Sequence, residues 1–178
     1  MKYLKFTYVD AVTGIPVTAA PAANGPTFPA VPGIEFAWAR ESQYPTSIPE
    51  FFGTCPDGTG ATAPGVLAEM TQQEWEAART DEMAIRAQRL MQSIVDATQK
   101  RLDDFAKTRN YDGILSAATY ATSTSSKFAA EGRCCVEARD ATWARLYAIL
   151  ADVEAGQRPA PSGFADIESE LPALVWPA

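Results

Sequence analysis

Apolar and polar side chains alternate over residues 2–9, with Leu4, Phe6 and Tyr8 on one side of the chain. A period of two is typical of a half-buried β-strand. Residues 15–19 predict a second strand, so the chain is expected to begin with a β-hairpin. Because an isolated hairpin is only marginally stable in water, we expect the apolar side of this one to bind a further surface.

Two surfaces fit the pattern. Residues 16–32 are rich in Pro, Ala and Gly, a composition that favours an extended, polyproline-like arm. Such an arm can reach a neighbouring chain, where an exposed strand edge can add to a partner sheet. The alternative is that the hairpin folds back on the alternating residues Ile34, Phe36 and Trp38 of the same chain.

The pattern changes to a helical period at Thr71, which begins the sequence Thr-Gln-Gln-Glu. This is a capping box, in which the Thr71 hydroxyl accepts a hydrogen bond from the Glu74 amide and the Glu74 carboxylate reaches back to Thr71. No Gly or Pro interrupts residues 72–110, and apolar residues recur at helical spacing. One long amphipathic helix is therefore predicted.

A second long helix is predicted to end just before Gly156, because glycine favours helix C-termini. Residues 110–113 break the first helix, and residues 114–121 predict a short one between the two. The polar residues 122–126 offer several N-cap candidates for the second long helix. Two long amphipathic helices joined in this way favour an antiparallel hairpin, in which each covers the apolar face of the other.

The apolar stripe of the second long helix includes Trp143 and one charged residue, Arg139. A buried charge without a partner is strongly destabilising. Arg139 is therefore expected to be paired with a carboxylate of the same or a neighbouring chain, or to lie near water. The apolar faces are wider than one partner helix covers, which favours a homo-oligomer.

These elements predict a mainly α protein. Its expected architecture is a long antiparallel helical hairpin with a small N-terminal β region and a Pro-rich arm. The predicted divisions are residues 1–70 for the strands, loops and arm, residues 71–158 for the hairpin, and residues 159–178 for a C-terminal tail with a short helix.

Composition argues against two classes of partner. The 178 residues carry a formal net charge of −7, whereas binding to a phosphate backbone relies on clustered Lys and Arg. Nucleic acid is therefore not an expected partner. No stretch reaches the roughly 18 consecutive apolar residues of a membrane-spanning helix, and no apolar signal-peptide core is recognisable. We expect no membrane span and synthesis in a cytoplasm.

The residues also argue against catalysis. The sequence has no histidine, which removes the commonest general base, the usual Ser and Cys triads and most catalytic zinc sites. Cys55, Cys134 and Cys135 lack C-x-x-C spacing, so small buried side chains are the simplest interpretation. The glycines of residues 53–65 match no phosphate-binding loop. We predict no catalytic residues, no cofactor and no metal site.

Five short segments in the second half of the chain form a recognisable pattern. They are residues 128–132 (FAAEG), 139–143 (RDATW), 153–159 (VEAGQRP), 170–172 (ELP) and 176–177 (WP). In order and spacing they resemble a C-terminal region of tail-fibre-associated and tail-fibre assembly proteins of tailed bacteriophages. Residues 51–57 and 65–74 are similar to the strand-to-helix join of small phage tail proteins.

The resemblance implies a non-enzymatic bacteriophage protein that binds tail-fibre or tail-tip proteins and stays in the virion as a structural component. The alternative is a tail-fibre assembly chaperone that binds transiently and is absent from the mature particle. A polysaccharide-depolymerising enzyme is a more distant alternative. The residues expected to contact a partner are Leu4, Phe6, Tyr8, Arg139 and Trp176.

Overall fold

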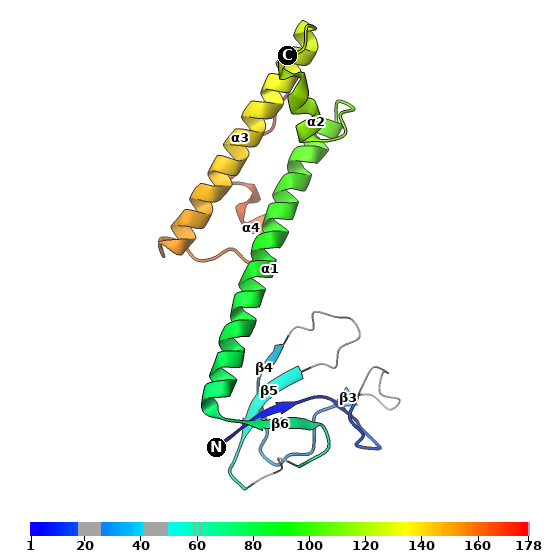
Figure 1. Ribbon diagram of the computed structural model, residues 1–178, viewed down its shortest axis with the longest axis vertical. Coiled ribbons are helices and arrows are strands. Elements are labelled where there is room, and N and C mark those ends of the chain that lie inside the picture. Colours follow the sequence, from blue (N-terminus) through cyan, green and yellow to red (C-terminus); the bar gives the residue numbers. More distant parts are fainter. Residues whose placement is uncertain (18–25, 41–49, 59, 61, 178) are drawn as a thin grey trace. The chain divides into compact units, whose positions relative to one another are not determined.

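The structure is a computed structural model that describes residues 1–17, 26–40, 50–58, 60 and 62–177. It contains two compact units, Met1–Arg86 (unit 1) and Ala87–Ala178 (unit 2). The boundary between them falls inside one continuous helix, α1 (Gln72–Lys107), which Figure 1 shows in green. The divisions predicted after residues 70 and 158 stay a prediction.

Unit 1 is built on a four-stranded antiparallel sheet (Figure 1). Its strand order is β4 (Glu35–Arg40), β5 (Glu50–Cys55), β1 (Lys2–Phe6) and β6 (Val66–Met70). The first strand of the chain therefore lies inside the sheet, with β5 on one side and β6 on the other. β1 is a central strand and leaves no free edge for a partner.

The segment after β1 turns back on itself, as the sequence predicts. Val9 bridges Pro16, and the Val17 amide donates to the Tyr8 carbonyl at 2.8 Å. Residues 18–19, the end of the predicted returning strand, lie outside the described residues. A second small sheet pairs β2 (Val9–Asp10) with β3 (Pro26–Thr27).

Loops of the same chain cover one face of the main sheet. Leu4 and Phe6 are fully buried there, in a cluster with Val31 and Cys55. The prediction that this side docks on a neighbouring chain is wrong, because residues 31–34 and 63–66 of the same unit supply the covering side chains. The alternative of a small sheet within the same chain is confirmed, since Phe36 and Trp38 lie in β4 of that sheet.

The first turns of α1 cover the opposite face. Phe52 is fully buried against Trp75 and Ala78 of that helix, and its ring stacks on Trp38 with centroids 3.8 Å apart. The alternation of side chains in β5 thus places successive residues in two different cores, as a period of two requires.

The described part of the predicted Pro-rich arm, residues 26–32, packs on unit 1 and does not reach away from it. Val31 is buried in the core of unit 1, and the ring of Phe28 lies 5.2 Å from that of Phe6 and 5.3 Å from that of Phe51. Apolar side chains interspersed among the prolines give this segment enough contact area to pack. Residues 18–25 of the predicted arm lie outside the described residues.

The helix starts where the capping box predicts. The Thr71 amide donates to Glu74 Oε2 at 2.8 Å, and the Glu74 amide donates to Thr71 Oγ1 at 3.2 Å. At the other end Asn110 adopts a left-handed conformation with φ 64°, which stops the helix near the predicted break. Asp103 then accepts the Ile114 amide at 2.8 Å and so fixes the start of the next helix.

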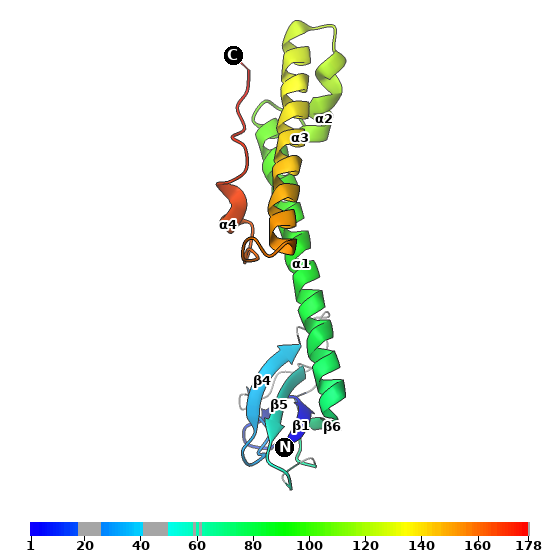
Figure 2. The same ribbon diagram turned by 90° about the vertical axis from the view of Figure 1, so that its left-hand side faces the viewer.

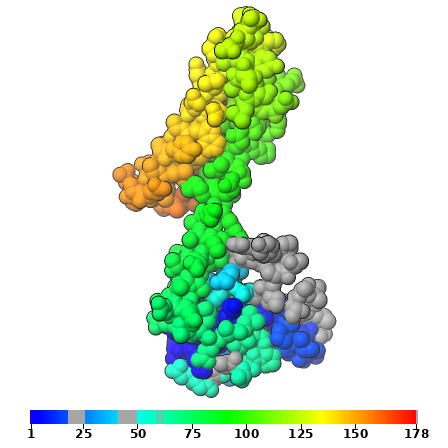
Figure 3. Space-filling model, in the orientation of Figure 1, coloured from blue at the N-terminus to red at the C-terminus, as the bar shows by residue number. Residues whose placement is uncertain are grey.

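After α1, unit 2 contains two short helical elements and a second long helix. The elements are α2 (Ile114–Ala118), the 3-10 helix η1 (Thr119–Thr122) and α3 (Ser126–Glu154). Gly156 follows α3 with φ 69°, which confirms the predicted glycine end. The space-filling view shows α2, η1 and the start of α3 closely packed together, in green and yellow (Figure 3).

The C-terminal segment, residues 159–177, completes the core of unit 2. It contains α4 (Ala165–Glu168) and runs alongside α3 in Figure 2. Buried residues of this segment and of both long helices form one cluster, and late α1 residues form a second with α2 and early α3. The first cluster is Ile94, Leu146, Ile149, Ile167 and Leu171, and the second is Leu102, Ala106, Ile114, Ala117 and Cys135.

The fold class is mixed α/β, with about 49% of the described residues in helices. The long helix and the small N-terminal sheet are confirmed. The description as mainly α is corrected, because the sheet and its loops hold a core of their own. No helix within the described residues has the length and apolar character needed to cross a membrane.

Candidate partner-binding site

The three predicted partner residues in unit 1 differ in their accessibility. Leu4 and Phe6 are fully buried inside the unit, so they are not available to another chain in this structure. Tyr8 is half-buried, and its ring lies 4.6 Å from that of Phe51 and 5.5 Å from that of Phe28. Tyr8 is thus part of an aromatic cluster on the sheet.

Arg139 lies at a surface hollow of about 610 Å³ in unit 2. Its side chain is 43% exposed, and its Nη1 lies 3.9 Å from Asp140 Oδ1. The expectation that this charge is paired or near water is confirmed. Trp143 of the apolar stripe lines the same hollow and is half-buried.

Trp176 packs on its own chain. Its ring stacks on Phe105 with centroids 4.3 Å apart, and the Arg109 guanidinium lies 5.1 Å from the ring centroid. The indole N–H donates to Thr108 Oγ1 at 2.9 Å. Trp176 therefore fastens the C-terminal segment to the end of α1 and is half-buried there.

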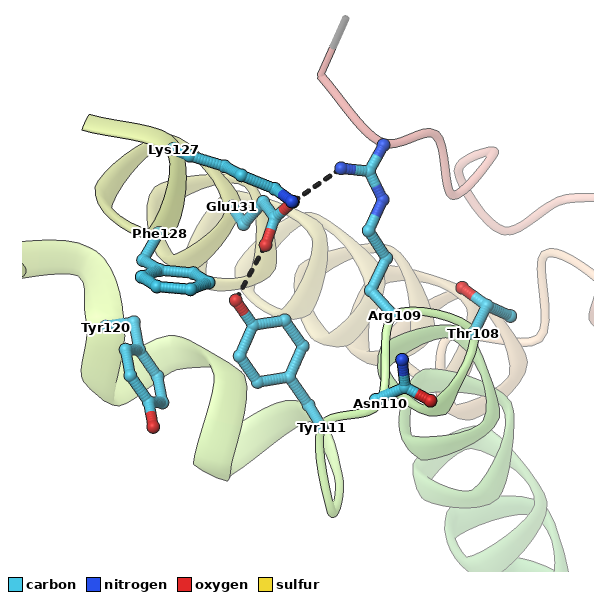
Figure 4. A pocket seen from close by; sticks show the side chains of 8 residues that line it. All are labelled: Thr108, Arg109, Asn110, Tyr111, Tyr120, Lys127, Phe128 and Glu131. Atoms are coloured by element: carbon cyan, nitrogen blue, oxygen red, sulfur yellow. Dashed lines mark hydrogen bonds and ion pairs between the residues drawn. The ribbon is translucent and has the colours of Figure 1, made fainter. Parts of the chain in front are cut away.

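A hydrogen-bonded polar cluster in unit 2, named the Glu131 site, is formed by Arg109, Tyr111 and Glu131 (Figure 4). Glu131 is 3% exposed. The Tyr111 hydroxyl donates to Glu131 Oε2 at 2.7 Å, and Arg109 donates to Glu131 Oε1. Each carboxylate oxygen thus has a donor, which is what a buried carboxylate requires.

Electrostatics in this site favour the ionised carboxylate. The hydrogen bonds from Tyr111 and Arg109, with the charges of Arg109 and Lys127, lower the pKa of Glu131 against the opposing effect of burial. Burial and the bond to Glu131 raise the pKa of Tyr111 to about 12. The lowered pKa of Glu131 gives stability that is present above the ordinary carboxyl range and lost in acid.

A hollow of about 460 Å³, the Lys127 hollow, opens beside the Glu131 site. It is lined by Thr108, Arg109, Asn110, Tyr111, Tyr120, Lys127, Phe128 and Glu131. Phe128 and Tyr120 are each 43% exposed, and their rings lie 5.8 Å apart (Figure 4). The hollow therefore offers both positive charge and apolar ring surface.

A second carboxylate, Glu170, anchors the C-terminal segment. Arg145 Nη2 donates to Glu170 Oε2 at 2.6 Å, and Arg158 Nη1 lies 2.9 Å from Glu170 Oε1. Arg101 donates to the Pro172 carbonyl at 2.8 Å. Three cations thus hold a short stretch of the segment in place.

These groups form hydrogen bonds and ion pairs within the chain. Glu131 accepts hydrogen bonds from Arg109 and Tyr111, and Glu170 is paired with Arg145 and Arg158. Tyr111 is a donor that keeps its proton to high pH. Burial raises the pKa of Cys135 to about 11 and also raises that of Cys134, so both stay thiols at neutral pH. Among the described residues no group of His, Cys, Asp or Glu is arranged to hold a metal ion.

Sequence reasoning missed the Glu131 site, although residue 131 lies within one of the quoted segments. Glu131 lies between Phe128 and Cys135 on the apolar stripe of α3, so a charge at a stripe position was the available signal, as it was for Arg139. The positions of Arg109 and Tyr111 depend on the chain reversal after α1, which no local pattern specifies.

No protein-family model, curated protein or solved structure matches the chain.

Proposed function

We propose that this chain is a non-catalytic, tail-associated structural protein of a bacteriophage that binds tail-fibre or tail-tip proteins in the virion. The proposal starts from the resemblance of residues 128–177 to tail-fibre-associated proteins. It includes synthesis in the bacterial host cytoplasm, later incorporation into the particle, and self-association as a homo-oligomer.

One observation carries the proposal. The segments that make up the resemblance fall at the contacts that close unit 2. Glu131 joins the end of α1 to α3, Glu170 binds Arg145 and Arg158, and Trp176 stacks on Phe105. Residues at such positions determine how the helices and the C-terminal segment of unit 2 pack together. We expect this role of the residues that characterise a family of structural or binding proteins.

Mass spectrometry of purified particles from the phage that encodes the chain tests this proposal. A virion component is expected in the particles at a constant copy number relative to the fibre protein. Absence from particles, with co-purification on the fibre protein from infected cells, would favour the transient assembly chaperone. Absence from both preparations would contradict the tail association.

A further inference from the structure

We propose that the Lys127 hollow binds an acidic side chain of a partner protein, with a neighbouring apolar residue of that partner against Phe128 and Tyr120. The inference rests on the proposed function for the identity of the partner as a tail or fibre protein. The binding chemistry rests on the hollow alone.

The charge balance of the hollow is the first argument. Arg109 and Lys127 are two cations, and among the residues that the structure describes Glu131 is the one carboxylate that lines the hollow with them. Both oxygens of Glu131 already accept hydrogen bonds from Arg109 and Tyr111. Lys127 forms no ion pair or hydrogen bond with any residue that the structure describes. The charge of Lys127 acts on Glu131 through space, and the described lining of the hollow still carries one more positive charge than negative charges.

The placement of Lys127 strengthens this argument. Lys127 and Arg109 also line a second hollow of about 290 Å³, together with Ser126, Ala130, Glu131 and Pro177. The ammonium group thus stands between two recesses, and Figure 4 shows it beside the Glu131 carboxylate and the Arg109 side chain. A carboxylate entering either recess meets the same pair of cations.

The aromatic wall is the second argument. Tyr111, Tyr120 and Phe128 form a row, with centroids 5.5 Å apart for the first pair and 5.8 Å apart for the second. Tyr120 and Phe128 are exposed and Tyr111 is half-buried. Accessible aromatic rings are enriched at protein interfaces, where they supply large contact areas at low entropic cost. The wall suits the methylene groups of an acidic side chain and one adjacent apolar side chain.

The nature of the ligand follows from size and charge. A volume of about 460 Å³ has room for two side chains, and an excess of one positive charge in the described lining suits one carboxylate. Nucleic acid would require several cations for successive phosphates, whereas this chain has a net charge of −7. An acidic segment of a protein is the partner that these features favour.

Amide NMR spectra of the full chain, titrated with the dipeptide acetyl-Leu-Glu-amide, test the proposal. The uncharged dipeptide acetyl-Leu-Gln-amide is the matched probe. We expect the acidic probe to shift the resonances of Tyr120, Lys127 and Phe128 saturably, and the uncharged probe to leave them in place.

Two variants assign the binding to the hollow. Lys127→Gln is expected to weaken binding of the acidic probe about two- to fivefold, the range for a partly exposed ion pair. Arg133→Gln removes one exposed cation from the same helix, but Arg133 lines neither hollow. Its effect is expected to be smaller than that of Lys127→Gln.

Several results would overturn the proposal. Equal shifts with both probes, or equal weakening by the two variants, would remove the charge-specific site. Tighter binding of an oligothymidylate at the same resonances would replace the protein partner by nucleic acid. Loss of self-association in Lys127→Gln, measured by sedimentation, would make a second copy of the chain the occupant. Because the purified chain is used, failure here leaves the particle experiment unaffected.

Discussion

Glu131 illustrates how one residue can fix several elements. Its carboxylate accepts from Arg109 after α1 and from Tyr111 at the turn, while its own backbone belongs to α3. Each hydrogen bond to an ionised group is stronger than a neutral one, and removal of one partner leaves a buried charge incompletely satisfied. The site therefore stabilises the chain reversal as well as the helix.

The Tyr111 phenol gives a test at this scale. Its raised pKa, about 12 against an ordinary 10.0, means that its contribution to stability is complete below pH 10 and is lost as pH rises through about 12. In Tyr111→Phe, the tyrosinate absorbance that develops near pH 12 should disappear. Tyr147→Phe removes a largely exposed ring and should retain that absorbance. Loss of the high-pH component in both variants would contradict the assignment.

Gly132 gives a second test. A Cβ added there would lie 2.2 Å from the Ala121 amide nitrogen and 2.4 Å from the Tyr120 carbonyl carbon, both backbone atoms. Gly132→Ala should lower the free energy of unfolding by about 1 to 3 kcal/mol through overpacking. This loss is expected even though alanine stabilises a helix by ~1 kcal/mol relative to glycine.

Denaturant unfolding with Gly163→Ala as the control checks this expectation. A Cβ at Gly163 would meet no atom within 4 Å, so that variant should unfold near the wild-type midpoint. A stable Gly132→Ala protein would show that η1 and α3 are not in close contact.

At the scale of elements, the C-terminal segment behaves as part of the core. Ile167 and Leu171 share a buried cluster with α1 and α3, and Leu174 and Trp176 pack against a second cluster. The segment has little regular structure of its own, because side-chain contacts and the Arg145–Glu170–Arg158 ion pairs position it. The C-terminal segment therefore depends on its contacts with α1 and α3 for a defined conformation.

A paired substitution tests the role of this segment. Ile167 is fully buried, whereas Val175 is 72% exposed. Ile167→Ala should cost about 2 to 5 kcal/mol of unfolding free energy, and Val175→Ala should stay within about 0.5 kcal/mol of wild type. Thermal and urea unfolding followed by circular dichroism measure both. Similar small effects would show that the segment is a detachable tail.

At the scale of the whole molecule, the apolar clusters divide between the two units. The clusters around Phe6 and Phe52 contain residues of unit 1, and those around Ile94 and Leu102 contain residues of unit 2. A substitution in one core therefore removes contacts from that unit alone. Helix α1 contributes to both units, with Trp75 and Ala78 in the first.

Phe6→Ala tests this division. Loss of a fully buried phenylalanine should destabilise unit 1 by about 3 to 5 kcal/mol. Hydrogen exchange followed by mass spectrometry should show faster exchange in β1, β5 and β6, with α2 and α3 unchanged. Accelerated exchange across all of these elements would mean that the two units unfold together.

The sequence by itself determined the features that depend on neighbouring residues. The Thr71–Glu74 capping box and the Gly156 helix end act within one turn, so their residues alone specify them. The alternation of Leu4 and Phe6 likewise revealed a strand with one buried side. The position of Arg139 on the apolar stripe also predicted that this charge would be paired or near water.

Only the tertiary structure decided what those elements contact. The side-chain period of β1 is the same whether its apolar side meets another chain or the loops of its own unit, so its central place in the sheet required long-range pairing. Arg109 binds Glu131 across 22 positions, and Trp176 binds Thr108 across 68. Such contacts depend on where chain reversals place distant residues, and local patterns do not record that.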